Sequence, residues 1–207
     1  MKIIDGLKLK GRPAEIPDCS REDLPKFFKE MGYKVGAEIG VFKGNFTKLL
    51  CKAGLRMYGI DPWASMDDYS PGDSGFQERE DYIFNKATNN LASYHDCTII
   101  RKTSMEALKD FEDESLDFVY IDGNHNFKHV AQDLFEWSKK VRKGGALAGH
   151  DYFYSPVFDH WCVCQVAYVV DAYTRAFRID QWYLLGRKSA LPGEKRDPHR
   201  SWMWIKK

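Results

Sequence analysis

The sequence predicts a doubly wound α/β fold, in which helices cover both faces of a mostly parallel sheet. Strand and helix patterns alternate through most of the 207 residues. Leu116–Ile121 is a continuous apolar strand between helices, which indicates burial on both faces. Residues 35–44 combine a buried strand, a glycine turn and the start of a helix. We therefore expect a seven-stranded sheet that ends in a C-terminal hairpin.

Composition narrows the class of protein further. A chain of 207 residues most simply forms one domain, 1–207, with a full core. Its 31 Lys and Arg against 30 Asp and Glu give no electrostatic footprint for nucleic acid or for an anionic membrane. No apolar run approaches the roughly 20 residues that span a bilayer, and five scattered cysteines fit reduced thiols. We therefore expect a cytoplasmic protein that binds neither nucleic acid nor membrane.

The first 34 residues are predicted as an N-terminal extension and one helix. Ser20 is a suitable N-cap for a helix over 21–31, with Asp23 at the capping-box position and Gly32 at the end. After the glycine turn the periodic pattern predicts helix 45–52, strand 57–60, a long loop 62–76 rich in Pro, Gly, Ser and Asp, helix 77–92 and strand 97–101.

The second half continues the alternation. It predicts helix 104–111, the strand Leu116–Ile121, helix 127–141 and strand 146–149. After Gly149 the pattern changes to a loop 150–160, a helix 161–176 and two strand-like segments, 180–187 and 201–206. We expect these last two segments to form a hairpin that closes one edge of the sheet.

Acidic residues and histidines follow the carboxyl ends of several predicted strands. Ligands bind outside these strand ends in doubly wound sheets. Any single carboxylate could be a solvated loop residue, but four strand ends of the same character predict a binding site. The residues placed there are Glu38 with the turn 40–44, Asp61, Ser104 with Met105, Asp122 with His125, and His150 with Asp151.

The glycine turn helps to choose the ligand. The distance in sequence from Gly40 to Asp61 suits an acid that binds a ribose, which NAD, FAD and S-adenosylmethionine share. The turn has the spacing G-x-x-x-G, and Glu38 stands beside it. A carboxylate repels a pyrophosphate but attracts the ammonium and sulfonium of S-adenosylmethionine. Two alternatives stay open: a nicotinamide-dependent oxidoreductase, and a non-catalytic module that binds S-adenosylmethionine or a nucleotide.

Taken in order, these motifs resemble those of class I S-adenosylmethionine-dependent methyltransferases. The resemblance covers residues 24–152 and is greatest to the small catechol- and macrocin-type O-methyltransferases, especially relatives with Asp-Gly-x-His and Gly-His-Asp-Tyr. It implies methyl transfer to a hydroxyl oxygen of a sugar, a phenol or a small metabolite, and it leaves homo-oligomer formation open. The motifs are residues 38–44, Asp61, Thr103-Ser104-Met105, Tyr120-Ile121-Asp122, and Gly144-Gly145 to Asp151.

The resemblance also implies roles for individual residues. The loops 62–76 and 150–160 would be the active-site and acceptor-side loops. Asp122 would lie beside both the cofactor and the acceptor. The other cofactor contacts would be Glu38, Gly40, Val41, Phe42 and Gly44 around the methionine part, Asp61 at the ribose, Pro62 and Trp63 along the adenosine, and Ser104 and Met105 at the adenine.

At two positions the sequence differs from the catechol-type motifs, and these positions concern the bound metal and the catalytic base. Tyr152 replaces a metal-binding Asn, and His125 replaces a catalytic Lys. The histidines allow two mechanisms. Asp122, His150 and Asp151 could hold a divalent ion softer than Mg²⁺, or a neutral His125 imidazole could accept the hydroxyl proton. All four residues are therefore catalytic candidates, although each histidine could also be purely structural.

Overall fold

The computed structural model describes residues 1–64, 76–154 and 164–207. The helices are α1 Ile3–Gly6, α2 Leu24–Glu30, α3 Asn45–Lys52, α4 Phe76–Leu91, α5 Ser104–Ala107, α6 Phe127–Lys140 and α7 Val166–Ala176, with 3₁₀ helices η1 Arg21–Asp23 and η2 Leu108–Asp110. The strands are β1 Ala14–Ile16, β2 Val35–Ile39, β3 Arg56–Ile60, β4 Cys97–Ile100, β5 Leu116–Ile121, β6 Val141–Tyr152, β7 Tyr183–Leu185 and β8 Arg200–Ile205.

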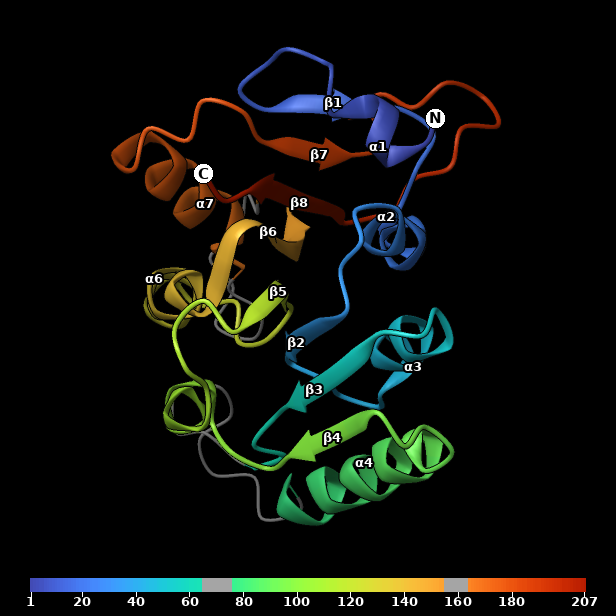
Figure 1. Cartoon of the computed structure of the whole chain (residues 1–207), viewed down its shortest axis with the longest axis vertical. Helices are drawn as coiled ribbons and strands as arrows, with labels where there is room; N and C mark the ends of the chain where they lie inside the picture. Colours follow the sequence, from blue (N-terminus) through green and yellow to red (C-terminus); the bar gives the residue numbers. More distant parts are fainter. Residues whose placement is uncertain (65–75, 155–163) are drawn as a thin grey trace.

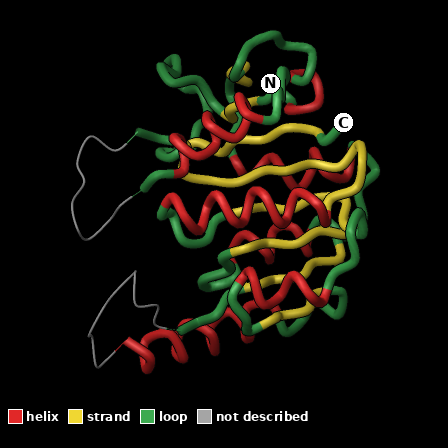
Figure 2. The backbone as a smooth tube through the Cα atoms, turned by 90° about the vertical axis from the view of Figure 1, so that its left-hand side faces the viewer, coloured by secondary structure: helices red, strands yellow, loops and turns green. Residues whose placement is uncertain are grey.

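These strands form a single sheet in the order β1-β7-β8-β6-β5-β2-β3-β4. Strands β2 to β6 pair in parallel, whereas β8 runs antiparallel to both β6 and β7. Helices α3 and α4 cover one face, and α6 and α7 cover the other (Figure 1). Figure 2 looks onto the second face, where the helices run alongside the strands. The predicted doubly wound class is confirmed.

The first 16 residues correct the predicted strand number, because they form α1 and an eighth strand. Strand β1 pairs in parallel with β7, with Ala14 opposite Tyr183. The β7–β8 hairpin therefore does not close the sheet, since β8 lies inside it and β1 forms the edge. A strand of three residues is too short to show a period, and its partner is far away in sequence.

Several predicted boundaries change when the residues are placed. The helix 21–31 divides into η1 and α2, and the Ser20 amide donates to the Asp23 carboxylate at 2.9 Å, as the capping box predicts. Strand β6 continues to Tyr152, so His150 and Asp151 belong to a strand and not to a loop. Most of the predicted loops 62–76 and 150–160, and the start of the predicted helix 161–176, lie outside the described residues.

The central strand β5 shows why the sheet needs both helical layers. All six of its residues are buried. Phe118 packs toward α2, where its ring stacks on Phe28 at 4.1 Å between centroids. Val119 belongs to the opposite hydrophobic cluster, together with Trp137 of α6. Apart from Asp117, the apolar pattern of this strand therefore corresponds to burial on both faces, as predicted.

No helix in the described part of the chain is both long and apolar enough to cross a membrane. Cys19, Cys51, Cys97 and Cys164 are free thiols, and Cys162 lies outside the described ranges. The single-domain division 1–207 stays a prediction.

Candidate functional site

A cavity of about 760 Å³ lies at the carboxyl ends of the parallel strands. The glycine turn after β2 forms one wall, and the segments after β3, β4 and β5 form the others. The structure thus brings together residues that are up to 112 positions apart, from 21 to 133. The predicted site residues that line it are Glu38, Gly40, Val41, Phe42, Asp61, Pro62, Ser104, Met105, Asp122 and His125.

The glycine turn lies against the end of β5. Gly40 has φ +89°, and a Cβ atom there would come well inside 3.0 Å of the Asp122 backbone carbonyl. Only glycine allows both this conformation and this close approach. Gly44 has a different task, because it is the left-handed N-cap of α3 and does not line the cavity. The predicted contact of Gly44 with the cofactor stays a prediction.

We expect Gly40→Ala to destabilise the fold by roughly 2 to 4 kcal/mol, because backbone strain adds to the clash with Asp122. Gly32→Ala is the matched control, since Gly32 has φ +75° but open space around its Cβ position. Urea unfolding of both variants measures the difference. Equal losses of stability would show that the approach to Asp122 has no energetic weight.

Asp61 fixes the shape of the turn. Its Oδ2 accepts hydrogen bonds from the amides of Val41 at 3.0 Å and Phe42 at 2.9 Å, and its Oδ1 accepts one from the Trp63 amide at 2.9 Å. Phe42 and Trp63 have φ of 51° and 41°, so Asp61 holds two strained residues in place. Burial raises the pKa of Asp61. The carboxylate offers about four acceptor positions, so it can still bind a ligand hydroxyl.

Trp63 does not line the cavity, and its predicted place along the adenosine stays a prediction. Its side chain is 1% exposed, and its indole Nε1 donates to the Phe42 carbonyl at 2.9 Å. The ring also packs edge-on against Phe84. Pro62, the preceding residue, does line the cavity.

Glu38 lies at the base of the cavity and is 2% exposed. The Thr47 hydroxyl of α3 donates to its Oε2. Burial raises the pKa of Glu38 well above its ordinary value, and the nearby Asp122 charge acts in the same direction. A cationic group of a ligand would compensate this carboxylate.

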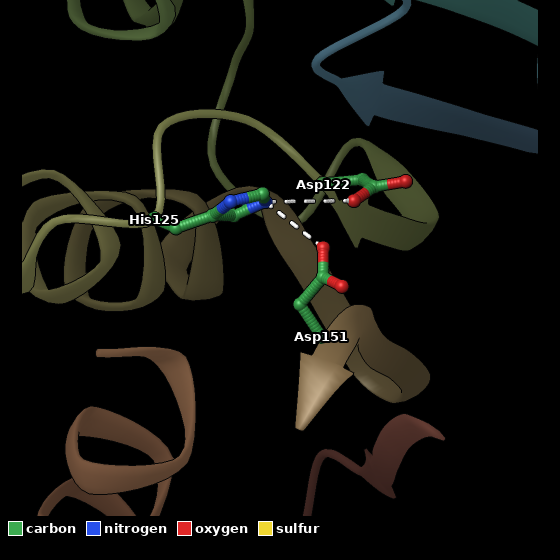
Figure 3. A group of neighbouring side chains, drawn as sticks. All are labelled: Asp122, His125 and Asp151. Atoms are coloured by element: carbon green, nitrogen blue, oxygen red, sulfur yellow. Dashed lines mark ion pairs between the residues drawn. The ribbon is translucent and has the colours of Figure 1, made fainter. Parts of the chain in front are cut away.

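The carboxylates and the histidine expected on the acceptor side come together at the ends of β5 and β6. Figure 3 shows the His125 ring pointing at both carboxylates. Its Nε2 lies 3.0 Å from Asp151 Oδ2 and 3.9 Å from Asp122 Oδ1. One ligand atom of each residue lies within 4.8 Å of the others. This spacing and these donor types fit a divalent ion.

The two carboxylates also control the protonation of His125. Burial acts against the charged ring, but hydrogen bonds to Asp122 and Asp151 outweigh it and raise the pKa of His125 to about 10. Burial likewise acts against an ionised Asp151, but bonding to His125 and His150 holds its pKa below the ordinary value. An imidazolium can neither accept a proton nor ligate a metal, so His125 must lose this proton before it can serve in either predicted role.

His150 stands outside the convergent group, so its predicted place in the metal set stays a prediction. Its Nδ1 lies 3.3 Å from Asp151 Oδ1 and 3.9 Å from Asp122 Oδ1. Its Nε2 is buried without a partner among the described residues, and the side chain does not line the cavity. The residue that completes the set with the two carboxylates is His125, not His150.

Two further residues reach this site from distant segments. Arg21, in η1, lines the cavity and places its Nη1 3.2 Å from Asp122 Oδ2. His199, just before β8, places its Nδ1 2.9 Å from Asp151 Oδ1 and stacks on Phe153. Neither residue follows a parallel strand, so the rule that located the other site residues could not find them.

The charge of the cavity wall bears on the ligand. Five acidic residues outnumber the three lysines and arginines together with the protonated His125, so the wall suits a cationic ligand better than a pyrophosphate. Among the described lining residues, the acids are Glu38, Asp61, Glu80, Asp122 and Asp133, and the bases are Arg21, Lys43 and Arg79.

The raised pKa of His125 predicts how stability changes with pH. Protonation of His125 stabilises the folded state fully below pH 6.5, and this contribution disappears as the pH rises through about 10. We expect the melting temperature of the protein in chelator to fall over that range, and His125→Ala to flatten the fall. Thermal unfolding from pH 6 to 10 compares the two proteins. Identical slopes would contradict the assigned pairing.

Comparisons with known proteins place this site in a family. The family described as "Methyltransferase domain" matches residues 37–152, more than half of the chain. A relative in Sinorhizobium fredii, the uncharacterized protein y4gI, is 30% identical over 120 residues, which are 55% of this chain. The chain spans only 12% of the length of that relative.

Solved structures share the fold at low sequence identity. The O-methyltransferase from Bacillus cereus, in complex with S-adenosylhomocysteine, has a TM-score of 0.59 at 16% identity, covering 90% of this chain and 80% of its own. The O-methyltransferase TomG from Streptomyces achromogenes, in complex with S-adenosylmethionine, has a TM-score of 0.61 at 13% identity. The match covers 90% of this chain and 79% of TomG. An rRNA methylase from Streptococcus thermophilus has a TM-score of 0.58 at 14% identity, and the match covers 88% of this chain and 93% of the methylase. The family match includes β2, β3, β5 and β6, which carry the site, and the chain belongs to the methyltransferase-domain family.

Proposed function

We propose that this chain binds S-adenosylmethionine in the cavity and transfers its methyl group to a hydroxyl oxygen of a small molecule. One observation carries the proposal: the buried Glu38, the glycine turn and Asp61 surround the same space. Family membership supports methyl transfer. Structures of the same fold, in complex with S-adenosylmethionine or S-adenosylhomocysteine, support the cofactor.

Each part of the cofactor finds a matching group. The ammonium would lie near Glu38, whose buried carboxyl has one described hydrogen-bond partner, Thr47. A ribose hydroxyl would donate to Asp61, which is a charge-assisted hydrogen bond. Ser104 and Met105 would border the adenine at the end of the cavity after β4. The excess of acidic residues in the wall argues against the pyrophosphate of NAD, the alternative from the sequence.

The acceptor would lie beside Asp122, which touches the cavity, and in front of Asp151. Methyl transfer is a displacement in line with the sulfonium–methyl bond, so its rate depends on holding the acceptor oxygen at near-attack distance. Asp122 would accept the hydrogen bond of the acceptor hydroxyl and orient it. Asp122, His125 and Asp151 would hold a divalent ion, which when bound lowers the pKa of the hydroxyl.

A sugar, a phenol or another small metabolite fits this proposal equally well. The near balance of 31 basic and 30 acidic residues supports a small acceptor over a nucleic acid. Assembly into a homo-oligomer and a cytoplasmic location stay predictions.

Calorimetry tests the cofactor first. We expect S-adenosylmethionine and S-adenosylhomocysteine to bind and NAD not to bind. At a ligand concentration of 100 times Kd, binding should stabilise the protein by about 2.7 kcal/mol through mass action, which raises the melting temperature. Labelled S-adenosylmethionine then reports transfer to a panel of sugars, phenols and small hydroxylated metabolites. Binding of NAD without binding of S-adenosylmethionine would contradict the proposal.

A further inference from the structure

Helix α6 carries a buried acid that the mechanism above does not use. Asp133 is 2% exposed, yet it lines the cavity. Its Oδ1 has no hydrogen-bond partner among residues 1–64, 76–154 and 164–207. Burial raises the pKa of Asp133 to about 6, although bonding to Ser104 and the charge of His129 act against the rise. A buried carboxyl oxygen without a partner destabilises a fold, so its presence here indicates a partner that arrives with a ligand.

The neighbours of Asp133 show which part of a ligand would reach it. Ser104 and Met105, from α5, line the same cavity, and the Ser104 side chain bonds to Asp133. These two residues border the adenine in the proposed function. Adenine presents an exocyclic amine that donates hydrogen bonds, whereas an ionised carboxylate only accepts them. The two groups are therefore complementary.

We propose that the Asp133 carboxylate accepts a hydrogen bond from the exocyclic amine of the adenine and makes the cavity selective for adenosyl over inosyl ligands. This inference rests on the proposed function. In an inosyl ligand a carbonyl oxygen replaces the amine, and its lone pairs would face those of Asp133. A site built around a hydrogen bond rejects the analogue that lacks it, because the buried group is then left unpaired.

A purely structural role for Asp133 has a specific alternative partner. Trp137 lies one turn further along α6, and its indole Nε1 also lacks a partner among the described residues. If Asp133 served to accept from this indole, its replacement would lower the stability of the free protein. The preference of the protein for one base over the other would then stay unchanged.

The experiment measures the affinity of S-adenosylhomocysteine and S-inosylhomocysteine by calorimetry. We expect the wild type to prefer the adenosyl ligand by about 10- to 100-fold, the range of one hydrogen bond to a charged group. Asp133→Asn should bring the ratio close to one, because an amide can accept from the amine or donate to the carbonyl. Asp133→Leu should also lose the preference, and urea unfolding should show both free variants at least as stable as the wild type.

Asp117→Asn is the matched control. This buried acid accepts from the amides of Lys34 and Val35 and from Arg142, away from the cavity. It should lose stability and keep the wild-type ligand ratio. Equal affinities in the wild type, or a preference that survives in both Asp133 variants, would overturn this inference alone. Failure of the wild type to bind either ligand would remove the proposed function, and this inference with it.

Discussion

Replacing His125 by Ala is expected to lower the methyl-transfer rate by roughly 10²- to 10⁴-fold, the range for loss of a group that handles the acceptor proton. The affinity for S-adenosylhomocysteine should stay unchanged, because His125 faces Asp122 and Asp151 and not the glycine turn. His95→Ala is the control, since His95 is exposed and does not line the cavity. Single-turnover kinetics with saturating labelled S-adenosylmethionine measures the effect.

Chelator separates the two mechanisms that include His125. If His125 completes a metal set with Asp122 and Asp151, activity should disappear in chelator and return with a divalent ion. The metal content of His125→Ala and Asp151→Asn should also fall. If the site works without metal, chelator should have no effect. Full activity in chelator together with an active His125→Ala variant would leave positioning of the acceptor as the source of catalysis.

Replacing Asp61 by Ala is expected to weaken S-adenosylhomocysteine binding by at least 10- to 100-fold. Loss of charge-assisted hydrogen bonds to the ribose accounts for about 1.5 to 3 kcal/mol. Three backbone amides, of Val41, Phe42 and Trp63, lose their acceptor in addition. The turn that shapes the cavity should then relax, because two of these residues are held at positive φ. Calorimetry gives the affinity directly.

The control for Asp61 is again Asp117→Asn, because Asp117 also accepts from two backbone amides but does not line the cavity. It should reduce the free energy of unfolding without changing the affinity. A conservative Asp61→Asn should bind better than Asp61→Ala, since the amide oxygen can still accept. Wild-type affinity in Asp61→Ala would show that this carboxylate serves the fold alone.

Local sequence patterns were sufficient to predict the architecture and the edge of the sheet that holds the candidate site. The helix at Asn45–Lys52 and the strand at Leu116–Ile121 were predicted with the boundaries that the structure has. Periodicity and capping are local properties, so these elements are visible in a single sequence. The strand-end rule then located Glu38, Asp61 and Asp122, because all parallel strands point the same way.

Which side chains face one another could not be predicted from local patterns. Strand β1 joins a partner about 170 positions away, and Arg21 and His199 reach the acidic residues from opposite ends of the chain. Long-range contacts of this kind leave no local pattern.

The direction of a side chain and its protonation state likewise leave no pattern in the sequence. Sequence order predicted His150 in the metal set and Trp63 at the cofactor. In the structure His150 lies outside the group of converging ligand atoms, and the Trp63 side chain is buried. The charge of His125 depends on two carboxylates from different strands. Spacing along the chain therefore predicted which strand ends form the candidate site. Side-chain direction, burial and the neighbouring charges exist only after folding, so that spacing could not predict them.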